Sequence, residues 1–425
     1  MSKISNGVLF SDKLSQEIKE RFYYVDNDPV FGERLFFANA GGSFRLKKAV
    51  DAFVKNDSIP DYPGRLHTRA FYLEKIQEDG LNDIRIILNP KAGSILTTLT
   101  ASQAMFDMVR AIAENVSGTN LVTSILEHPS AYDSMEYYAG KLGKEFRVAK
   151  SNPVTGGVDV DEIIKLVDKD TCLLSVMYAS NISGVINDIE NIVKKARRIK
   201  PDLYIIVDAV QHAPHNVIDL QKISVDGINF APYKFFGCRG LGIAWLSERA
   251  AVLPHDKMIS KEANVWELGS PAISQFAVVT EIVNYVCWIG KKFIKASDRR
   301  ELFACGMEKI ALQERALMAR MLNGTDEILG LRYIKGVKVF LDNEDLTKRD
   351  FIIAMGFENL GYTQAVQEYD KKGVIVYERL ISSPYSKRML DSFDLDGVIR
   401  IAPLHCHSVG DIDKFLMVTR ELSQL

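Results

Sequence analysis

The sequence predicts an α/β protein with a large domain, built on a mainly parallel sheet that helices cover, and a smaller α+β C-terminal domain. Between Ser94 and Leu246, short β-rich runs alternate with segments whose apolar residues recur at helical spacing. The β-rich runs are apolar almost throughout, which is typical of strands buried on both faces of a parallel sheet. From residue 274 to residue 319 the pattern is long-helical, and strands return after Leu331. This change indicates the second domain.

The elements follow in order along the chain. Strands of the large domain are expected at 94–99, 121–126, 145–150, 172–179, 203–209, 227–231 and 241–247. Helices are expected between them at 102–116, 130–143, 159–169 and 188–199. The last of these helices ends with two arginines in its final turn and Pro201 beyond, which is a typical helix stop. In the smaller domain, strands are expected at 332–341, 351–357, 373–380 and 397–403.

These elements predict a division of the chain into three parts. Residues 1–35 form an N-terminal arm that packs on the small domain, residues 36–290 form the large domain, and residues 291–425 form the small C-terminal domain. No low-complexity segment, long linker or internal repeat interrupts this order.

Composition narrows the function classes. The formal net charge is −2, from 53 basic and 55 acidic residues, so we expect no nucleic-acid partner and no anionic membrane surface as partner. We find neither the apolar run of a signal peptide nor a long uncharged segment that would span a bilayer. Five scattered cysteines, none in a CxxC pair, fit a reducing compartment and predict no metal site. The sequence therefore predicts a cytoplasmic protein.

The stretch from Tyr204 to Gly242 carries an acid and a base at the ends of two neighbouring apolar runs. Asp208 ends the run YIIVD, and Lys234 follows the run GINFA. Ligands of parallel α/β sheets bind beyond the carboxyl ends of the strands, so both side chains are expected in one crevice. A lysine amine can hold an aldehyde as a Schiff base, and a buried carboxylate can keep a ring nitrogen protonated. This pair is what pyridoxal phosphate requires.

The same residues resemble those of the class V aminotransferase superfamily of pyridoxal-phosphate-dependent enzymes, and most closely its cysteine desulfurase-like subgroup. In VDAVQHAPH, Asp208 matches the aspartate that contacts the pyridine nitrogen, and Gln211 the glutamine at the ring oxygen. In APYKFFG, Lys234 matches the Schiff-base lysine. The resemblance extends from about Asn39 to Leu422. It implies fold type I of the pyridoxal-phosphate-dependent transferases.

Further motifs of the chain match the family's cofactor site. EHPSAYDS resembles the segment whose histidine stacks on the cofactor ring, so His128 is expected there with a catalytic role beside Lys234 and Asp208. YASNISGV places Asn181 near the ring oxygen. LTASQAMF resembles the phosphate-binding loop, which implies phosphate contacts from Ala101 and Ser102, although Ser102 read alone is an ordinary helix N-cap.

Some positions depart from the pattern of many desulfurases. A serine and a histidine that bind phosphate just before the lysine are replaced by Ala231 and Tyr233. Tyr233 can still donate its phenol to the phosphate, as the corresponding tyrosine does in kynureninase-like relatives. Part of the binding of the phosphate must therefore come from other residues, or the phosphate is bound more weakly.

The resemblance also implies a substrate site and a dimer. In GVIRIAP, Arg400 matches the arginine that clamps the substrate's α-carboxylate, and Asn39 in FANAGGS matches a substrate-side loop. WELGSPAIS resembles a loop whose hydroxyl reaches the phosphate of the partner subunit. Ser270 therefore implies a homodimer with shared active sites.

The reaction is left with several candidates. Desulfurases carry a nucleophilic cysteine on a loop before the carboxylate-binding arginine, and residues 371–399 contain no cysteine. The sequence therefore favours β-elimination at a sulfur-bearing carbon, a C–S lyase reaction on an amino acid. Transamination and epimerisation use the same residues and stay open, as does a non-catalytic pyridoxal-phosphate-binding homologue. A nucleotide-binding enzyme is disfavoured because no GxGxxG or GKS/T motif follows a strand.

Overall fold

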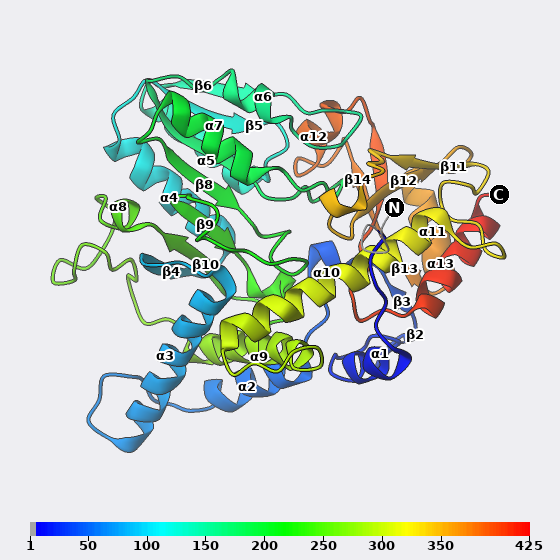
Figure 1. Cartoon of the computed structure of the whole chain (residues 1–425), viewed down its shortest axis with the longest axis horizontal. Helices are drawn as coiled ribbons and strands as arrows, with labels where there is room; N and C mark the ends of the chain where they lie inside the picture. The colour runs from blue at the N-terminus through cyan, green and yellow to red at the C-terminus, as the bar shows by residue number, and fades with distance from the viewer. Residues whose placement is uncertain (1–5) are drawn as a thin grey trace.

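Two larger β-sheets organise the chain, one in each half of the molecule (Figure 1). The structure is a computed structural model and describes residues 6–425. The first sheet has seven strands in the order β4-β10-β9-β8-β7-β5-β6. Its strands are β4 (Ser94–Thr98), β5 (Asn120–Ser124), β6 (Glu145–Ala149), β7 (Thr171–Met177), β8 (Tyr204–Asp208), β9 (Gly227–Phe230) and β10 (Gly242–Leu246).

The seven-stranded sheet is mainly parallel, as predicted, with one reversed strand. The pairs β9–β8, β8–β7, β7–β5 and β5–β6 are parallel, whereas β10 runs antiparallel to both of its neighbours. The reason is the short connection from Phe230 to Gly242, which holds only a 3-10 turn and no crossover helix. A parallel return would need a connection of about a dozen residues or more, usually with a helix.

Helices cover both faces of this sheet, because successive strand residues point to opposite sides. Leu121, Leu173 and Ile206 pack in one apolar cluster with α4 (Ala101–Asn115), α5 (Pro129–Lys141) and α8 (Glu248–Ala251). Their chain neighbours pack in the cluster on the opposite face. That face is covered by α3 (Thr68–Leu88), α6 (Val160–Ile164), α7 (Ile189–Ile199) and α9 (Ile273–Gly290), with α2 (Lys47–Asp57) packed on α9.

The smaller sheet has the order β11-β12-β15-β14 and is antiparallel throughout. Its strands are β11 (Val337–Phe340), β12 (Ile353–Phe357), β14 (Tyr377–Leu380) and β15 (Gly397–Ile401). It packs on α11 (Tyr362–Lys371), α13 (Val409–Leu422) and the C-terminal part of α10 (Arg299–Asn323), and α12 (Lys387–Asp391) lies between β14 and β15 in the chain. The predicted fold class, a large α/β part with a smaller α+β part, is confirmed.

One expected strand of the small domain is divided in two. Residues 373–380 form β13 (Val374–Ile375), which pairs in parallel with β3 (Leu35–Phe36), and then β14, which pairs with β15. The first part of the segment thus pairs with the N-terminal region, and the second part pairs with β15, the strand that contains Arg400. The N-terminal region also contains β1 (Asn27–Asp28), β2 (Gly32–Glu33) and α1 (Asp12–Lys19), whose Lys19 forms an ion pair with Asp411 of α13.

Helix α10 runs from one half of the molecule to the other without a break (Figure 1). Leu302, Phe303 and Met307 belong to the apolar cluster beneath the large sheet, and Leu317 and Met321 belong to the cluster of the small one. Between these two sets, the Glu314 carboxylate lies 2.7 Å from His215 Nδ1 and accepts a hydrogen bond from the His405 amide at 3.1 Å. The helix therefore ties the two halves together through apolar packing and a buried charge.

By length and composition, α9 could cross a membrane, and it is the one helix of residues 6–425 that could. Most of this helix is buried inside the protein, where it packs against α2, α3 and α10. It is a core helix of the structure.

Candidate active site

A cavity of about 200 Å³ lies at the carboxyl edge of the large sheet, where β7, β8 and β9 end. Residues far apart in the sequence meet there because parallel strands bring their carboxyl ends to the same edge. Eight of the predicted site residues line the cavity: Ala101, Ser102, His128, Asn181, Asp208, Gln211, Tyr233 and Lys234. The site is therefore assembled from five connections, those that follow β4, β5, β7, β8 and β9.

Asp208 and Lys234 both line this cavity, and the charge of each affects the pKa of the other. Asp208 is the last residue of β8, and its Oδ1 accepts a hydrogen bond from the Val210 amide at 2.9 Å. Lys234 ends the 3-10 turn that follows β9. Burial raises the pKa of the Asp208 carboxyl, and the Lys234 charge opposes that rise. Burial, followed by the nearby Arg400 charge, lowers the pKa of the Lys234 amine to about 7.

The lowered Lys234 pKa predicts how the amine reacts in cofactor-free protein. A neutral amine is the nucleophile toward aldehydes, so labelling of Lys234 by a small aldehyde and borohydride should rise through pH 7 and level off near pH 8. An ordinary lysine, with a pKa of about 10.4, continues to gain reactivity up to pH 10. Peptide mass spectrometry of the labelled protein measures both classes of lysine in one sample. A Lys234 profile that rises only above pH 9 would contradict this assignment.

His128 is fixed by the helix that it caps. It is the N-cap of α5, and its Nδ1 accepts a hydrogen bond from the Ser130 amide at 3.2 Å. Burial, followed by the Lys234 charge, lowers the His128 pKa to about 4. The imidazole is therefore neutral near pH 7, with Nδ1 unprotonated and the proton on Nε2. Pro129 at the first helical position favours this start of the helix.

The N-terminus of α4 forms another wall of the cavity. Thr100, and not Ser102, is the N-cap, because its side chain accepts a hydrogen bond from the Gln103 amide at 3.1 Å. The Ser102 hydroxyl therefore remains available to a ligand. Gly242 permits this arrangement, since a Cβ there would lie 2.1 Å from the Thr100 carbonyl carbon. A helix N-terminus of this kind favours a phosphate group.

Arg400 lies beside the cavity at Asn181. Its Nη1 donates a hydrogen bond to the Asn181 carbonyl at 3.1 Å, and its side chain is almost completely buried. Burial, followed by the positive charge of Arg379, lowers the Arg400 pKa to about 9. Within residues 6–425, Arg400 Nε and Asn181 Oδ1 are buried and have no hydrogen-bond partner. These two atoms are therefore available to a ligand in the cavity.

Three predicted residues offer the cavity only part of their side chain, or none of it. Gln211 Nε2 donates to the Ala40 carbonyl at 3.0 Å, which leaves its second amide proton and Oε1 for the cavity. The Asn39 amide donates to the carbonyls of Phe36 and Ala402 and accepts from the Phe44 amide, so it holds a loop and does not line the cavity. Ser270 is exposed on a loop outside the cavity of its own chain.

The structure adds three ionisable residues that the sequence interpretation did not assign. Arg239 lines the cavity and stacks on the Tyr233 ring at 4.3 Å. Glu127 is buried behind His128, and burial raises its pKa to about 8. Arg379 of β14 is close enough to lower the pKa of His128 and of Lys234. The sequence held no local signal for Arg379, because its place beside Arg400 follows from the pairing of β14 with β15.

The lysine, the buried aspartate and the free helix N-terminus fit one kind of cofactor: an aldehyde-bearing ring with a protonated nitrogen and a phosphate. The fold and site therefore define a pyridoxal-phosphate-dependent enzyme of fold type I. Residues 36–402 match the family described as Aminotransferase class-V. The chain belongs to this family, whose cofactor is pyridoxal 5'-phosphate.

Curated relatives and solved structures agree with this family. The chain is 28% identical to the cysteine desulfurase IscS of Buchnera aphidicola (Schizaphis graminum) over 49% of this chain, so it spans 52% of that relative's length. It is 27% identical to a probable cysteine desulfurase of Borreliella burgdorferi, over 71% of each chain. The apo structure of a cysteine desulfurase from Thermococcus onnurineus superposes with a TM-score of 0.80 at 19% identity, over 96% of this chain and 98% of that one. The structural likeness confirms the fold.

Proposed function

We propose that this protein is a pyridoxal-phosphate-dependent C–S lyase that removes a sulfur substituent from the β-carbon of an amino acid. The observation that carries the proposal is the placement of Lys234, Asp208 and His128 around one cavity with Arg400 beside it. Bound pyridoxal phosphate supplies an electron sink for the bonds of the amino acid's α-carbon. The relatives named as cysteine desulfurases support sulfur chemistry.

Each residue of the chain has a proposed task in this reaction. Lys234 Nζ tethers the cofactor and then, as a neutral amine near pH 7, takes the α-proton of the substrate. Asp208 keeps a positive charge on the ring nitrogen by its own negative charge. His128, neutral and fixed by its helix cap, packs on the ring face with its Nε2 proton available. Arg400 holds the α-carboxylate in a bidentate fork.

The remaining predicted residues hold the cofactor. We propose that the Ala101 and Ser102 amides and the Ser102 hydroxyl bind the phosphate, with Tyr233 and the newly assigned Arg239 taking the place of the serine and histidine found in many desulfurases. Asn181 and Gln211 contact the ring oxygen. For Asn39 we propose a positioning task, because its amide joins the strand before it to residue 402.

The cysteines support elimination without a persulfide on the enzyme. All five are unpaired, and none lies on the segment between β14 and β15. Burial raises the thiol pKa of Cys406 well above its usual value, and it also raises that of Cys238, the cysteine nearest to Lys234 in the sequence. A thiol with a raised pKa is a poor nucleophile near neutral pH. The unpaired thiols also support the cytoplasmic location that we propose.

A product assay tests the proposed reaction. Purified holoenzyme incubated with cysteine and S-substituted cysteines should release pyruvate together with the sulfur fragment in equal amounts. Conversion of the cofactor to its amine form, with no pyruvate, would instead favour transamination, and loss of substrate optical activity alone would favour epimerisation. A holoenzyme that yields none of these products from a broad amino-acid panel would overturn the proposal and favour the non-catalytic alternative.

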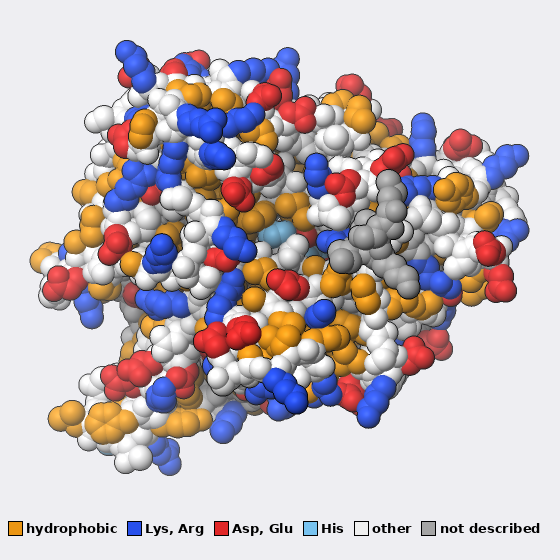
Figure 2. Space-filling view, viewed as in Figure 1, with side chains coloured by type: hydrophobic (Ala, Val, Ile, Leu, Met, Phe, Trp, Pro, Cys, Tyr) orange, Lys and Arg blue, Asp and Glu red, His pale blue; other side chains and the backbone are white. Residues whose placement is uncertain are grey.

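We also propose that the protein is a homodimer in which Ser270 contacts the phosphate in the partner's site. Large apolar side chains are exposed around the loop that carries Ser270 and around the start of α3: Leu66, Phe71, Leu99, Met258, Ile259 and Leu268. Figure 2 shows hydrophobic side chains on the protruding end of the molecule at the lower left, where α3 begins in Figure 1. Exposed apolar clusters of this kind mark protein interfaces.

Charge substitution at this surface should separate the subunits. The double variant Leu66→Asp, Ile259→Asp should sediment as a monomer at micromolar concentration, whereas the wild type sediments as a dimer, because burying two unpaired carboxylates is costly. Val154→Asp, at an apolar residue that is 77% exposed on another loop, is the matched control and should remain dimeric. A wild-type protein that sediments as a monomer would contradict the proposal.

A further inference from the structure

Two arginines lie on the same face of the small sheet, next to the active-site cavity. Arg400 of β15 is paired with Tyr377 of β14, and Arg379 follows two residues later on the same strand. Opposed residues of an antiparallel pair share a face, and so do alternate residues of one strand. Arg379 and Arg400 are therefore diagonal neighbours. The Tyr377 ring, 5.5 Å from the Arg400 guanidinium, lies beside them.

Neither guanidinium has an acidic partner within residues 6–425. Arg400 Nη1 donates to the Asn181 carbonyl at 3.1 Å, and Arg379 Nη2 donates to the Tyr385 carbonyl at 2.6 Å. The Nε atoms of both residues are buried and unpartnered. By contrast, Arg320 and Arg332, in the same half of the molecule, form ion pairs with aspartates at 2.6 and 2.7 Å. The two arginines beside the cavity thus keep their charge and part of their hydrogen-bonding capacity for a ligand.

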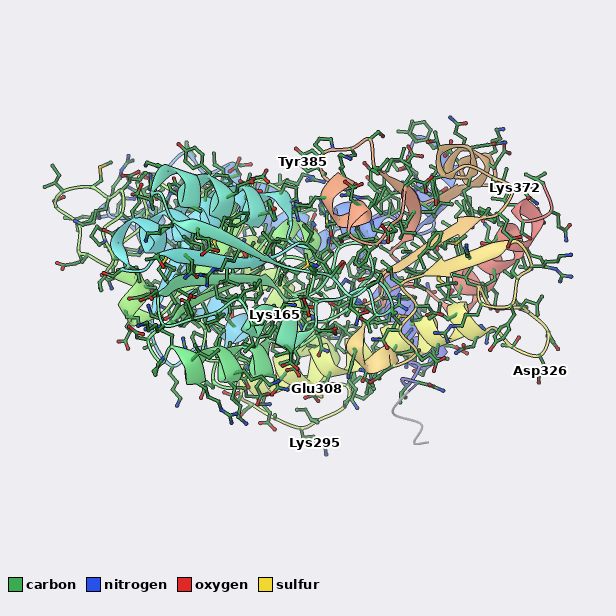
Figure 3. The ribbon with its side chains drawn as sticks, turned by 90° about the horizontal axis from the view of Figure 1, so that it is seen from above. Lys165, Lys295, Glu308, Asp326, Lys372 and Tyr385 are labelled. Atoms are coloured by element: carbon green, nitrogen blue, oxygen red, sulfur yellow. The ribbon has the colours of Figure 1, made fainter. Side chains whose placement is uncertain are left out.

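The segment after Arg379 reaches the surface and then returns to the large domain. Tyr385, whose carbonyl accepts the Arg379 hydrogen bond, has an exposed side chain. Figure 3 shows Tyr385 at the outer edge of the molecule, beside the junction of the two halves. Arg388, a few residues later, stacks on the Tyr132 ring at 3.7 Å and donates to the Glu127 carbonyl at 2.7 Å. The segment is thereby fastened to the large domain next to His128.

The charges around the cavity are unbalanced. Asp208 is the single acidic residue among the described residues that line it. Glu127 behind it is held neutral near pH 7 because burial raises its pKa to about 8. Arg400 and Arg379 both lower the pKa of Lys234, which shows that their positive fields reach the amine. Buried like charges oppose one another unless an anion lies between or beside them.

One α-carboxylate can occupy the guanidinium of one arginine. In the proposed function Arg400 binds the α-carboxylate, so Arg379 has no assigned ligand group. We propose that the substrate is an amino acid whose side chain carries a second anionic group, and that Arg379 binds this group. The inference rests on the proposed function and deepens it by naming the substrate class. Diagonal cross-strand neighbours lie about 7–8 Å apart, with their Cβ atoms somewhat closer. A carboxylate at the end of a short β-substituent lies at a comparable distance from the α-carboxylate.

A matched pair of ligands tests the second anion. S-carboxymethyl-L-cysteine and S-carbamoylmethyl-L-cysteine have the same shape and differ in the side-chain charge. Titration of the holoenzyme, followed through the cofactor absorbance, gives an apparent Kd for each. A charge-assisted contact to the carboxylate should make the acid bind about ten- to a hundredfold more tightly than the amide in the wild type.

Variants of Arg379 assign the preference to this residue. Arg379→Gln should bind the acid and the amide equally, with the Kd of the amide unchanged, and Arg379→Lys should keep part of the preference. Lys338→Gln removes a positive charge from the exposed edge strand β11 of the same sheet and should keep the full preference. Retained cofactor absorbance shows that each variant is folded.

Two sets of results separate this inference from the proposed function. An amide that binds as tightly as the acid in the wild type, or a preference that survives in Arg379→Gln, overturns the second anion site and leaves the lyase proposal intact. A holoenzyme whose absorbance responds to no amino acid overturns the proposed function, and the substrate class with it.

Discussion

Replacing Lys234 with alanine should abolish both the absorbance of the bound cofactor and turnover. Purified wild-type protein should show the band of a lysine-bound pyridoxal phosphate, at roughly 410–430 nm. Lys234→Ala removes the amine proposed to form this bond and to take the α-proton, so kcat/KM should fall by about a thousandfold or more. Absorption spectra and pyruvate release measured on the same preparations check the two effects together.

Folding of this variant can be monitored independently. Burial lowers the pKa of the Lys234 amine, because the surroundings disfavour its positive charge. Removal of the amine should therefore not destabilise the cofactor-free protein. Lys222→Ala, at a lysine whose side chain is 78% exposed, is the matched control and should keep the band and the activity. A Lys234→Ala protein that remains yellow and active would place the cofactor on another residue.

Asp208→Asn should give a different result, in which the cofactor stays bound and turnover is lost. The asparagine oxygen can still accept the Val210 amide hydrogen bond, so the loop after β8 is expected to keep its conformation. The variant loses the negative charge that is proposed to keep the ring nitrogen protonated. Because the carboxylate charge is expected to stabilise the transition state, its loss should lower kcat by about a hundredfold or more. Steady-state kinetics together with the absorption spectrum measure this separation.

The stability of the Asp208→Asn variant provides a second readout. The folded-state pKa of Asp208 is raised above its unfolded value, so the ionised carboxylate lowers the free energy of unfolding at pH values above the folded pKa. In cofactor-free form, the asparagine variant should therefore melt at the same temperature as the wild type near pH 7, or higher. Turnover within about threefold of the wild type would show that the charge of Asp208 is not used.

Much of the large domain could be predicted because its signals are local. Strands such as β7 and β8 are continuous apolar runs, and α7 has a regular apolar stripe with arginines in its last turn. The predicted element bounds were wrong where a contact with a distant residue overrides the local helix pattern. The helix expected over 159–169 ends at Ile164, because the Asp168 side chain binds Asn120 and Arg147 and fixes a turn instead.

The cavity-lining residues were predictable because strand ends and motif spacing lie in the sequence itself. The supporting contacts were not. No local signal shows that the Asn39 amide reaches residue 402, that Thr100 rather than Ser102 caps α4, or that residues 373–380 divide between two sheets. The Asn39 contact and the division of residues 373–380 depend on pairing between segments that are distant in the chain, whereas the choice between Thr100 and Ser102 is a matter of one turn of helix. Arg379 shares this difficulty, because its place beside Arg400 follows from the register of β14 on β15.

The unbroken α10 has a consequence for how an amino acid reaches the cavity. A helix of 25 residues is about 37 Å long and bends little, so the two halves of the molecule have no hinge along it. The Glu314 contacts to His215 and His405 brace its middle. The distance between the amine in one half and the guanidinium in the other is then set when the chain folds. The protein's own freedom to vary this distance is lost at that stage, so the arriving amino acid does not have to order the two groups relative to each other.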